Sequence, residues 1–378
     1  MNTRIKILCA VGTRPEAIKM APIILELKKC AWANVRVLAS AQHRELLDRP
    51  MATFGIKPDI DLDIMQPGQQ LAQLTSRLIE GLDKVLRDEK PDVVLGQGDT
   101  TTVFATALAC FYLHIPFAHV EAGLRSYDFR NPFPEEANRI LAGHLSSFHF
   151  SPTEQSKKNL LKEGIKPDRI FVTGNSVIDA LHLILKDHAK PVTIGKPGVR
   201  KILVTAHRRE NFGEPLLRIC QALKTIARRS DIEIILPVHP NPNVTKIFSD
   251  QLGGLSNVYL IPPMDYMDFI PLMKESYLIL TDSGGVQEEA PALGKPVLVM
   301  RETTERPEAK DFGVVELVGT DEKLIVERVF KLLDDETFYK SMAKGVSPYG
   351  DGKTSERIRD ILHQVFVSDP SSLKRLSI

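Results

Sequence analysis

The chain has 378 residues, of which 43% are hydrophobic and 26% are charged, a composition typical of globular proteins. This length exceeds what one hydrophobic core usually supports, so two domains are predicted. Lys and Arg (49) nearly balance Asp and Glu (48), which leaves a net charge of +1 and argues against a nucleic-acid-binding protein. Any anionic ligand must therefore be bound by a local cluster of positive groups.

The cysteines and the apolar segments indicate where the protein resides. Four cysteines lie far apart and form no CxxC pair, namely Cys9, Cys30, Cys110 and Cys220. This spacing argues against a disulfide framework and fits a reducing compartment. The apolar run at 5–11 is too short for a signal peptide, and the uncharged stretch at 100–120 is interpreted as a buried helix leading into a strand. We therefore expect a cytoplasmic protein that does not enter a membrane.

Short β-branched runs alternate with longer amphipathic stretches, which is the pattern of βαβ units around a parallel sheet. In the first half, helices are predicted most clearly at 16–29 and 71–88. Strands are predicted there at 5–11, 35–41, 93–96, 117–120 and 170–173. Pro and Gly among polar residues at 187–200 indicate a linker.

A second series of strands follows this linker. They are predicted at 202–205, 234–237, 258–261, 277–281 and 297–300. We therefore expect an α/β protein with two Rossmann-like domains, 1–186 and 200–353, facing each other across a cleft. Parallel sheets of this kind bind ligands beyond the carboxyl ends of their strands, so the residues that follow each strand are the candidates for chemistry.

The first predicted strand is followed by a Gly-Thr-Arg-Pro-Glu turn that opens a helix. Gly12 permits a tight turn, and Pro15 suits the first turn of a helix. Arg14 and Lys19 then lie near the helix N-terminus, where cations and free amides suit an anionic ligand. The alternative is that both are ordinary surface cations.

Three carboxylates follow predicted strands of the first half or open the next helix. Asp99 follows the third strand and could equally be a helix N-cap. Glu121 stands at the mouth of the fourth strand, although a salt bridge to Arg125 would also explain it. Glu135 begins a helix after two prolines, a position in which acids are favoured by the helix dipole alone.

The second half offers a compact cationic cluster and a candidate phosphate cradle. His207 is followed by Arg208 and Arg209 at a strand end, while His239 suits capping or packing as well as ligand binding. A Ser-Gly-Gly turn at 283–285 joins a strand to a helix, so its free N–H groups and the helix dipole suit a diphosphate. Glu289, one turn later, could accept hydrogen bonds from ribose hydroxyls. The alternative is that the segment 283–285 is only a tight turn and binds no ligand.

No cofactor is predicted. The segment 96–101 resembles GxGxxG but carries Thr101 in place of the last glycine, so a nicotinamide site is rejected. The sequence also lacks HExxH, GxSxG, Walker A and metal-spaced His/Cys motifs. Acidic side chains in the first half and a nucleotide cradle in the second therefore favour metal-free proton transfer on a nucleotide-linked substrate.

A series of sequence blocks resembles the non-hydrolysing UDP-N-acetylglucosamine 2-epimerases. The blocks run in order over nearly the whole chain: GTRPEAIKMA at 12–21, GDTTT at 98–102, HVEAGLRS at 119–126, PEEANR at 134–139, HRREN at 207–211, TDSGGVQEEAP at 281–291, TTERPEA at 303–309 and PYGDG at 348–352. Together they are highly specific, although no single block is.

The resemblance implies a GT-B fold in which the helix at about 354–378 returns to the first domain. It also implies interconversion of UDP-GlcNAc and UDP-ManNAc, which would supply surface polysaccharides, and a homodimer. It assigns acid/base roles to Asp99, Glu121 and Glu135 and a role at the UDP group to His207. Contacts to the nucleotide sugar are implied for Arg14, Lys19, Asp99, Glu121, His207, Met264, Phe269, Ser283, Gly284, Gly285, Glu289 and Arg306.

The resemblance also implies a second UDP-GlcNAc site that activates the enzyme. Gln42, His43 and Arg44 match that site, and Gln69 stands in a pair that differs from some members. Met264 stands where close relatives carry a Gln near the uracil. Gln97 stands where many members have His, and no role is assigned to it.

The chemistry of an N-acetyl sugar favours elimination over direct deprotonation, because its C2 hydrogen is not adjacent to a ring carbonyl. Departure of UDP acidifies C2, so a base can remove the proton to give 2-acetamidoglucal, and re-addition from the opposite face gives the epimer. Carboxylates on two faces and cations at the diphosphate meet these needs. The alternatives are a GT-B glycosyltransferase, a hydrolysing epimerase and a silent nucleotide-sugar sensor.

Overall fold

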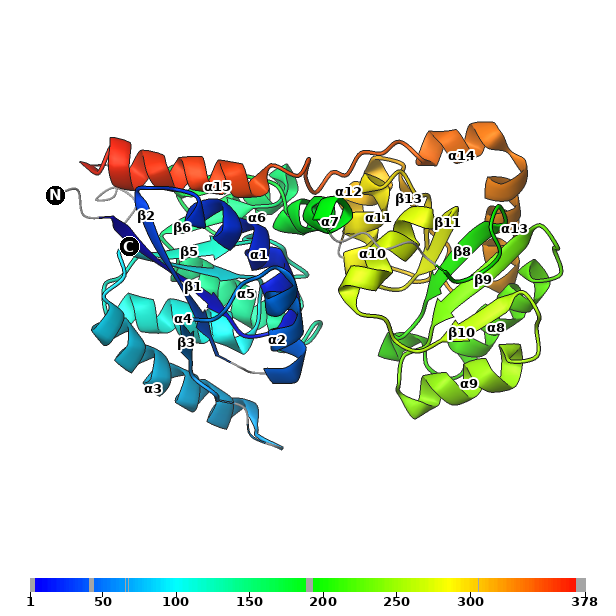
Figure 1. The fold of residues 1–378 in the computed structure, drawn as a ribbon, viewed down its shortest axis with the longest axis horizontal. Coiled ribbons are helices and arrows are strands. Elements are labelled where there is room, and N and C mark those ends of the chain that lie inside the picture. Colours follow the sequence, from blue (N-terminus) through cyan, green and yellow to red (C-terminus); the bar gives the residue numbers. More distant parts are fainter. Residues whose placement is uncertain are drawn as a thin grey trace. The chain divides into compact units, whose positions relative to one another are not determined.

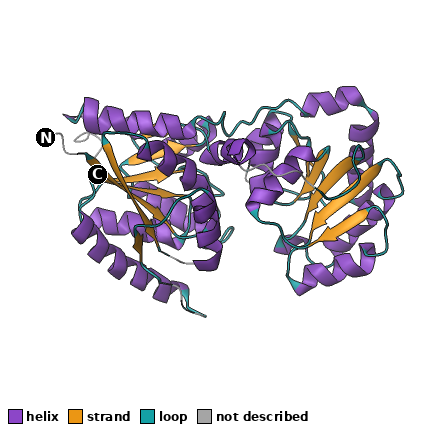
Figure 2. Ribbon diagram, viewed as in Figure 1, coloured by secondary structure: helices purple, strands orange, loops and turns teal. Residues whose placement is uncertain are grey.

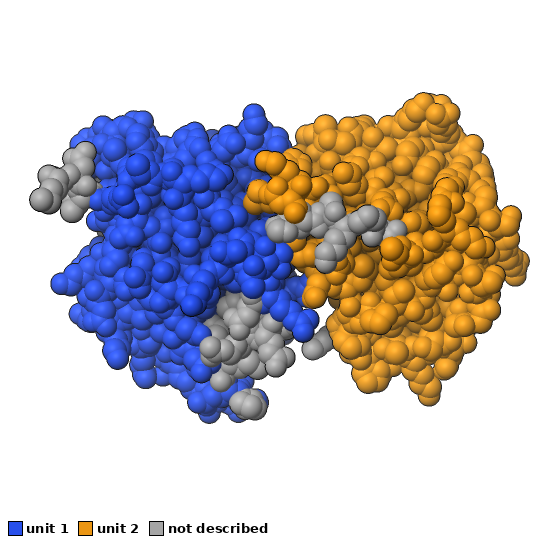
Figure 3. Space-filling model, viewed as in Figure 1, with its two compact units in different colours: residues 1–180, 349–378 blue, residues 181–348 orange. Residues whose placement is uncertain are grey.

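The computed structural model describes residues 4–40, 44–64, 66, 68–187, 193–304 and 306–371. The chain forms two compact units, which Figure 3 distinguishes by colour. Unit 1 comprises Met1–Ala180 and Tyr349–Ile378, and unit 2 comprises Leu181–Pro348. The chain therefore leaves unit 1 within one helix and returns to it near residue 349.

Unit 1 is built on a seven-stranded parallel sheet with the order β3-β2-β1-β4-β5-β6-β7. Its strands are β1 (Ile5–Val11), β2 (Ala33–Ala39), β3 (Ile60–Asp61), β4 (Val93–Gln97), β5 (Phe117–Val120), β6 (Phe148–Ser151) and β7 (Ile170–Val172). Its helices are α1 (Arg14–Lys28), α2 (Arg44–Thr53), α3 (Leu71–Glu89), α4 (Thr101–Tyr112), α5 (Glu135–His144), α6 (Glu154–Lys162) and α15 (Thr354–His363); α7 (Ser176–Asp187) spans the unit boundary.

Helices cover the sheet of unit 1, as Figures 1 and 2 show. Helix α3 illustrates why, because it places a leucine on one face at every fourth residue. Leu74, Leu78, Leu82 and Leu86 are all buried in one cluster with α4 and the sheet. Burial of each such side chain stabilises the fold by roughly 1.5–3 kcal/mol.

Unit 2 contains a six-stranded parallel sheet with the order β10-β9-β8-β11-β12-β13. Its strands are β8 (Arg200–Thr205), β9 (Ile232–Pro237), β10 (Val258–Ile261), β11 (Leu278–Thr281), β12 (Val297–Val299) and β13 (Val315–Leu317). The helices are α8 (Glu214–Ile226), α9 (Pro242–Leu252), α10 (Tyr266–Glu275), α11 (Gly284–Ala292), α12 (Pro307–Asp311), α13 (Glu322–Asp334) and α14 (Glu336–Met342). Helices α8, α9 and α13 share one buried apolar cluster with the sheet.

The α/β class and the parallel sheets predicted from the sequence are confirmed. The strands predicted at 5–11, 117–120 and 258–261 match β1, β5 and β10 residue for residue. Three strands were not predicted, namely β3, β6 and β13. The two residues of β3 leave too few alternations for a periodic signal, while Glu316 and buried His149 interrupt the apolar runs of β13 and β6.

The C-terminal helix α15 packs against α1 in unit 1 (Figure 1). Arg359 of α15 forms an ion pair with Glu26 of α1. The ring of His363 meets Trp32 edge-on at a centroid distance of 5.3 Å. These contacts join segments more than 300 residues apart, as the pair Arg359–Glu26 is separated by 333 positions.

No helix among the described residues is both long enough and apolar enough to cross a membrane.

Candidate functional site

Each sheet reverses its strand order at one point, and open parallel sheets bind ligands at that point. In unit 1 the reversal lies between β1 and β4, and in unit 2 it lies between β8 and β11. The segments that leave these four strands begin at Gly12, Gly98, Ala206 and Asp282. Most residues proposed from the sequence follow these strands or their neighbours.

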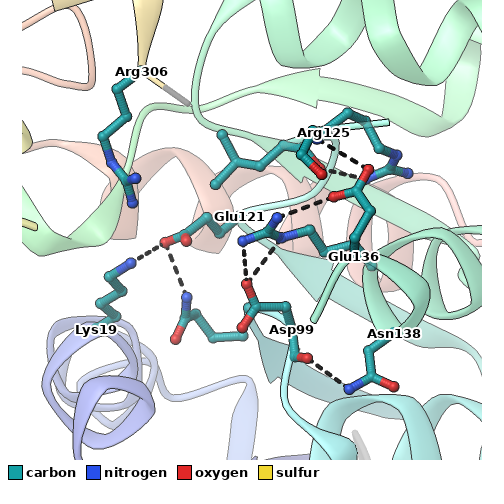
Figure 4. A network of polar contacts seen from close by, with 12 residues as sticks. Lys19, Asp99, Glu121, Arg125, Glu136, Asn138 and Arg306 are labelled. Carbon is teal, nitrogen blue, oxygen red and sulfur yellow. Dashed lines mark hydrogen bonds and ion pairs between the residues drawn. The ribbon is translucent and has the colours of Figure 1, made fainter. Parts of the chain in front are cut away.

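Glu121 is the centre of a buried polar cluster in unit 1 (Figure 4). Its Oε2 atom accepts hydrogen bonds from Lys19 Nζ at 2.5 Å, Gln97 Nε2 at 2.9 Å and Asn175 Nδ2 at 3.1 Å. The side chains of Glu121 and Lys19 are only 6% and 15% exposed. The residue has a φ of +65°, which is rare for a side chain other than glycine and is typical of functional sites.

Two alternatives considered for these residues are wrong. Lys19 is not an ordinary surface cation, because its ammonium group pairs with a buried carboxylate. Arg125 does not pair with Glu121. Its guanidinium instead forms a two-pronged ion pair with Glu163, through Nε at 2.7 Å and Nη2 at 2.8 Å.

Asp99 lies beside this cluster and is held by Arg139 of α5 (Figure 4). Arg139 Nε and Nη2 approach Asp99 Oδ2 at 2.9 Å and 2.6 Å, and Nη1 reaches Glu136 Oε2 at 3.1 Å. Burial acts to lower the pKa of Arg139, but the charges and hydrogen bonds of Asp99 and Glu136 outweigh it and raise that pKa. The N-cap alternative for Asp99 is wrong, because Thr100 caps α4 by accepting from the Val103 amide.

Glu136 fixes the loop that follows β5. Its side chain is fully buried, and Oε1 accepts hydrogen bonds from the backbone amides of Ser126 at 3.0 Å and Tyr127 at 2.8 Å. The same carboxylate therefore organises the loop that carries the HVEAGLRS residues and holds Arg139 against Asp99.

Unlike Glu121 and Asp99, Glu135 has a buried carboxylate oxygen without a hydrogen-bond partner among the described residues. It is the first residue of α5, as an acid favoured by the helix dipole would be. The buried oxygen is its Oε2 atom. Buried carboxylate oxygens are seldom left unsatisfied, so this atom is suited to a ligand.

The turn after β1 is fixed by Glu16, which sequence reasoning had not singled out. Its carboxylate accepts from the amides of Gly12 at 2.5 Å and Thr13 at 2.9 Å and from the Thr100 hydroxyl. Burial raises the pKa of Glu16 to about 7 against the effect of these donors. Arg14 opens α1 from this turn and is half-buried, with no ion pair to any described residue.

In unit 2, a buried carboxylate supports the loop after β8. Asp282 Oδ2 accepts from the amides of His207 and Arg208, both at 2.8 Å, and from Asn211 Nδ2 at 3.0 Å. Its Oδ1 lies 3.3 Å from His207 Nδ1, and the His207 ring stacks with the His239 ring at a centroid distance of 5.6 Å. Burial lowers the pKa of His207, Asp282 acts against that, and Arg208 and His239 add to the lowering.

Helix α11 begins at the predicted Ser-Gly-Gly turn, with Ser283 as its N-cap and Gly284 as its first residue. A Cβ atom added at Gly285 would meet no atom within 4 Å, so open space lies over the backbone there. Within the helix, buried Glu289 accepts from the Tyr266 hydroxyl. Arg306 pairs with Glu288 at 2.5 Å.

The remaining predicted residues lie at the margins. Met264 and Phe269 are half-buried, just before and within α10. Gln69 accepts from Arg77 Nη1 at 3.0 Å at the start of α3. Gln42 and His43 of the predicted activator site lie outside the described residues, so the structure does not bear on them.

Sequence reasoning missed several residues that the structure places in contact with the predicted ones. Gln97 and Asn175 donate to Glu121, Arg139 holds Asp99, and Asp282 supports His207. Asn175 follows Gly174 and lies three residues beyond the last residue of β7, so the strand-end rule could have found it. The partner of a charged side chain, by contrast, is not encoded in any local pattern.

Comparison with known proteins agrees with this geometry. The sequence model of the UDP-N-acetylglucosamine 2-epimerase family matches residues 25–363. The chain is 53% identical to the UDP-N-acetylglucosamine 2-epimerase of Salmonella typhimurium, over 96% of this chain and 100% of that protein.

Solved structures lead to the same result. The UDP-GlcNAc 2-epimerase of Neisseria meningitidis, bound to UDP-GlcNAc, is 48% identical with a TM-score of 0.88, covering 95% of this chain and 100% of that one. The Methanocaldococcus jannaschii enzyme, in complex with UDP-GlcNAc and UDP, is 37% identical with a TM-score of 0.79, covering 95% and 99%. The chain therefore belongs to the UDP-N-acetylglucosamine 2-epimerase family.

Proposed function

We propose that this chain interconverts UDP-GlcNAc and UDP-ManNAc without hydrolysing them, by eliminating and re-adding UDP. One observation carries the proposal: three carboxylates, Asp99, Glu121 and Glu135, belong to one unit, while the other presents an open helix N-terminus at Ser283–Gly285. The first can move protons on a sugar, and the second suits a diphosphate leaving group.

In the forward step, a carboxylate removes the C2 proton as the bond between C1 and the UDP oxygen breaks. The electrons of the C2–H bond form the C1–C2 double bond of 2-acetamidoglucal, and the electrons of the C1–O bond leave with UDP. In the return step, a second acid delivers a proton to the opposite face of C2, and UDP adds again to C1. The glycal and UDP must remain bound in between.

The proton-transfer groups in this scheme are Asp99 and Glu121, with Glu135 completing the set. Their surroundings support different tasks. Glu121 receives three hydrogen-bond donors on one oxygen, and Asp99 is paired with Arg139. Glu135 instead has a buried oxygen without a hydrogen-bond partner in the described chain. Carboxylates held in different environments can serve as acid and base in the same reaction.

The leaving group needs positive charge and amides at its phosphates. In our proposal, the α11 N-terminus at Ser283, Gly284 and Gly285 binds the diphosphate, with His207, Arg14 and Lys19 contributing charge. Glu289 accepts from the ribose, and Arg306, Met264 and Phe269 complete the nucleotide contacts. The first domain, proposed to span 1–186, thus supplies the acids, and the second, proposed to span 200–353, supplies the UDP site.

His207 leads to a prediction about proton uptake. Its pKa is lowered in the free protein, chiefly by burial, so the ring is largely neutral near pH 7. A bound diphosphate raises that pKa, and UDP binding is expected to take up a fraction of one proton. Calorimetric titrations in phosphate and in Tris should therefore give different binding enthalpies, and the difference should disappear in His207→Asn.

The matched control for this experiment is His182→Asn, because His182 is an exposed histidine of α7. That variant should keep the buffer dependence of the wild-type protein. Equal binding enthalpies in both buffers for the wild-type protein would contradict the role given to His207.

Product analysis tests the proposed activity and separates it from its rivals. Purified protein incubated with UDP-GlcNAc alone should yield UDP-ManNAc by NMR. A glycosyltransferase would need an acceptor, a hydrolysing epimerase would release free ManNAc, and a sensor would bind without turnover. Any of these three results would reject the proposal.

Three further features are part of the proposal: a second UDP-GlcNAc acting as an activator at the Gln42, His43 and Gln69 region, a homodimer, and a cytoplasmic location. The Methanocaldococcus jannaschii relative was solved in complex with two ligands, UDP-GlcNAc and UDP. That finding supports a search for a second nucleotide on this chain by equilibrium binding at saturating UDP.

A further inference from the structure

Asn175 occupies an unusual position in unit 1, because three parts of the fold meet at its backbone and side chain. It follows β7 and Gly174 and precedes the first residue of α7. The residue is 2% exposed. Its side-chain Nδ2 donates to Glu121 Oε2 at 3.1 Å, and its Oδ1 accepts from the backbone amide of Val177 at 3.2 Å. The two bonds need opposite ends of the amide, which fixes the orientation of the group.

The backbone of Asn175 is tied to the segment by which the chain re-enters unit 1. Its N–H donates to the carbonyl of Tyr349 at 2.5 Å, and Tyr349 is the first residue of the returning part of unit 1. Tyr349 is fully buried. A side chain at Gly174 would lie 2.8 Å from Thr354 Oγ1 and 3.3 Å from the Gly350 Cα atom, so only glycine permits this close approach. Asn175 is therefore held rigidly from behind.

The contact with Glu121 is made on the same oxygen that Lys19 and Gln97 approach. Lys19 has a long, flexible side chain. The side chain of Asn175 is short and buried, and the residue is held by hydrogen bonds at its backbone N–H and at its Oδ1 atom. A rigid neutral donor can hold a carboxylate in one orientation and favour its charged form.

We propose that Asn175 is a positioning residue for Glu121. Its Nδ2 holds the Glu121 carboxylate in one orientation relative to the sugar, and Asn175 is itself held by the hydrogen bond from the Val177 amide and by its backbone bond to Tyr349. This inference rests on the proposed epimerase function, in which Glu121 transfers a proton. Asn175 itself is not given contact with the substrate.

Asn175→Asp separates this role from a structural one. Aspartate caps a helix start as well as asparagine does, so the bond from the Val177 amide is kept. The donor that faces Glu121 is replaced by a second negative charge. We expect kcat for UDP-GlcNAc to fall by about ten- to a hundredfold with little change in KM. We also expect the acid limb of the kcat profile to move to higher pH, because a nearby negative charge favours protonation of Glu121.

A matched control is Asn257→Asp in unit 2. Asn257 is another partly buried asparagine whose Nδ2 donates, here to the backbone carbonyls of Ala227 at 3.0 Å and Arg229 at 3.1 Å, and neither of these residues belongs to the proposed site. The control should keep wild-type kcat and pH profile. If Asn175→Asp does not fold, Asn175→Ser serves instead, because serine keeps a cap acceptor but is too short to donate to Glu121, and kcat should fall about tenfold.

The outcomes distinguish the two proposals. Wild-type protein that makes no UDP-ManNAc overturns the proposed function. Wild-type protein that is active, together with folded Asn175 variants of unchanged kcat and pH profile, overturns the positioning role alone. A loss of kcat with a displaced acid limb in Asn175→Asp, and not in Asn257→Asp, supports it.

Discussion

Replacement of Glu121 by Gln is expected to lower kcat by about a thousandfold while the protein remains folded. General acid and base groups typically contribute between about a hundred- and ten-thousandfold to a rate. Gln has the shape of Glu and can still accept from Gln97 and Asn175 through its amide oxygen. It cannot take a proton from carbon, so the loss should appear in kcat far more than in KM. Steady-state kinetics on UDP-GlcNAc and a thermal melt measure both effects.

Glu163→Gln is the matched control for the loss of a carboxylate. Glu163 pairs with Arg125, whose side chain is completely buried, so the change also leaves a buried cation without its partner. Glu163 has no role in the proposed chemistry. The control is expected to lose stability but to retain its turnover per folded molecule. Wild-type turnover in Glu121→Gln would remove Glu121 from the mechanism.

Replacement of Gly123 by Ala is expected to lower the free energy of unfolding by about 3 kcal/mol. Gly123 has a φ of +92° and follows Glu121 in the turn after β5. An added Cβ atom would lie 2.3 Å from the carbonyl oxygen of Ser156 in α6, which is backbone and cannot rotate away. The left-handed conformation costs about 1–2 kcal/mol, and the overpacking adds about 1–3 kcal/mol.

A melting temperature lowered by roughly 10 °C would correspond to such a loss in a unit of this size. Gly81→Ala is the control. Gly81 lies within α3, and its added Cβ atom would lie at an ordinary contact distance of 3.4 Å from Leu62 Cδ2. Alanine is the better helix former, so this variant should be as stable as the wild-type protein or slightly more so. A Gly123→Ala protein that melts with the wild type would show that the turn can open without cost.

The sequence predicted the fold well because the periodicity of long strands and helices is a local signal. Strands such as β1 carry a full run of buried apolar residues. The two residues of β3 and the three of β13 do not, and only their partners in the sheet define them as strands. The boundaries of the predicted strands shifted by one or two residues, as at β8, which begins at Arg200 and not at 202.

The site was predicted less completely, because a charged residue's partner depends on contacts distant in the chain. Glu121 and Lys19 are 102 positions apart, whereas Arg125, the partner that the sequence suggests for Glu121, is only four residues away. Asp99 likewise resembled an N-cap, yet Thr100 takes that role and leaves the Asp99 carboxylate to Arg139. The positions of the strand ends therefore predicted where the site lies, but only the tertiary structure shows which charged residues pair within it.

Turnover of UDP-GlcNAc in deuterated water tests the central claim most directly. If proton removal at C2 accompanies departure of UDP, the UDP-ManNAc formed should carry deuterium at C2, and NMR should show the loss of the C2 proton signal in the product. UDP-ManNAc that retains the original C2 hydrogen would contradict elimination and the roles given to Asp99, Glu121 and Glu135.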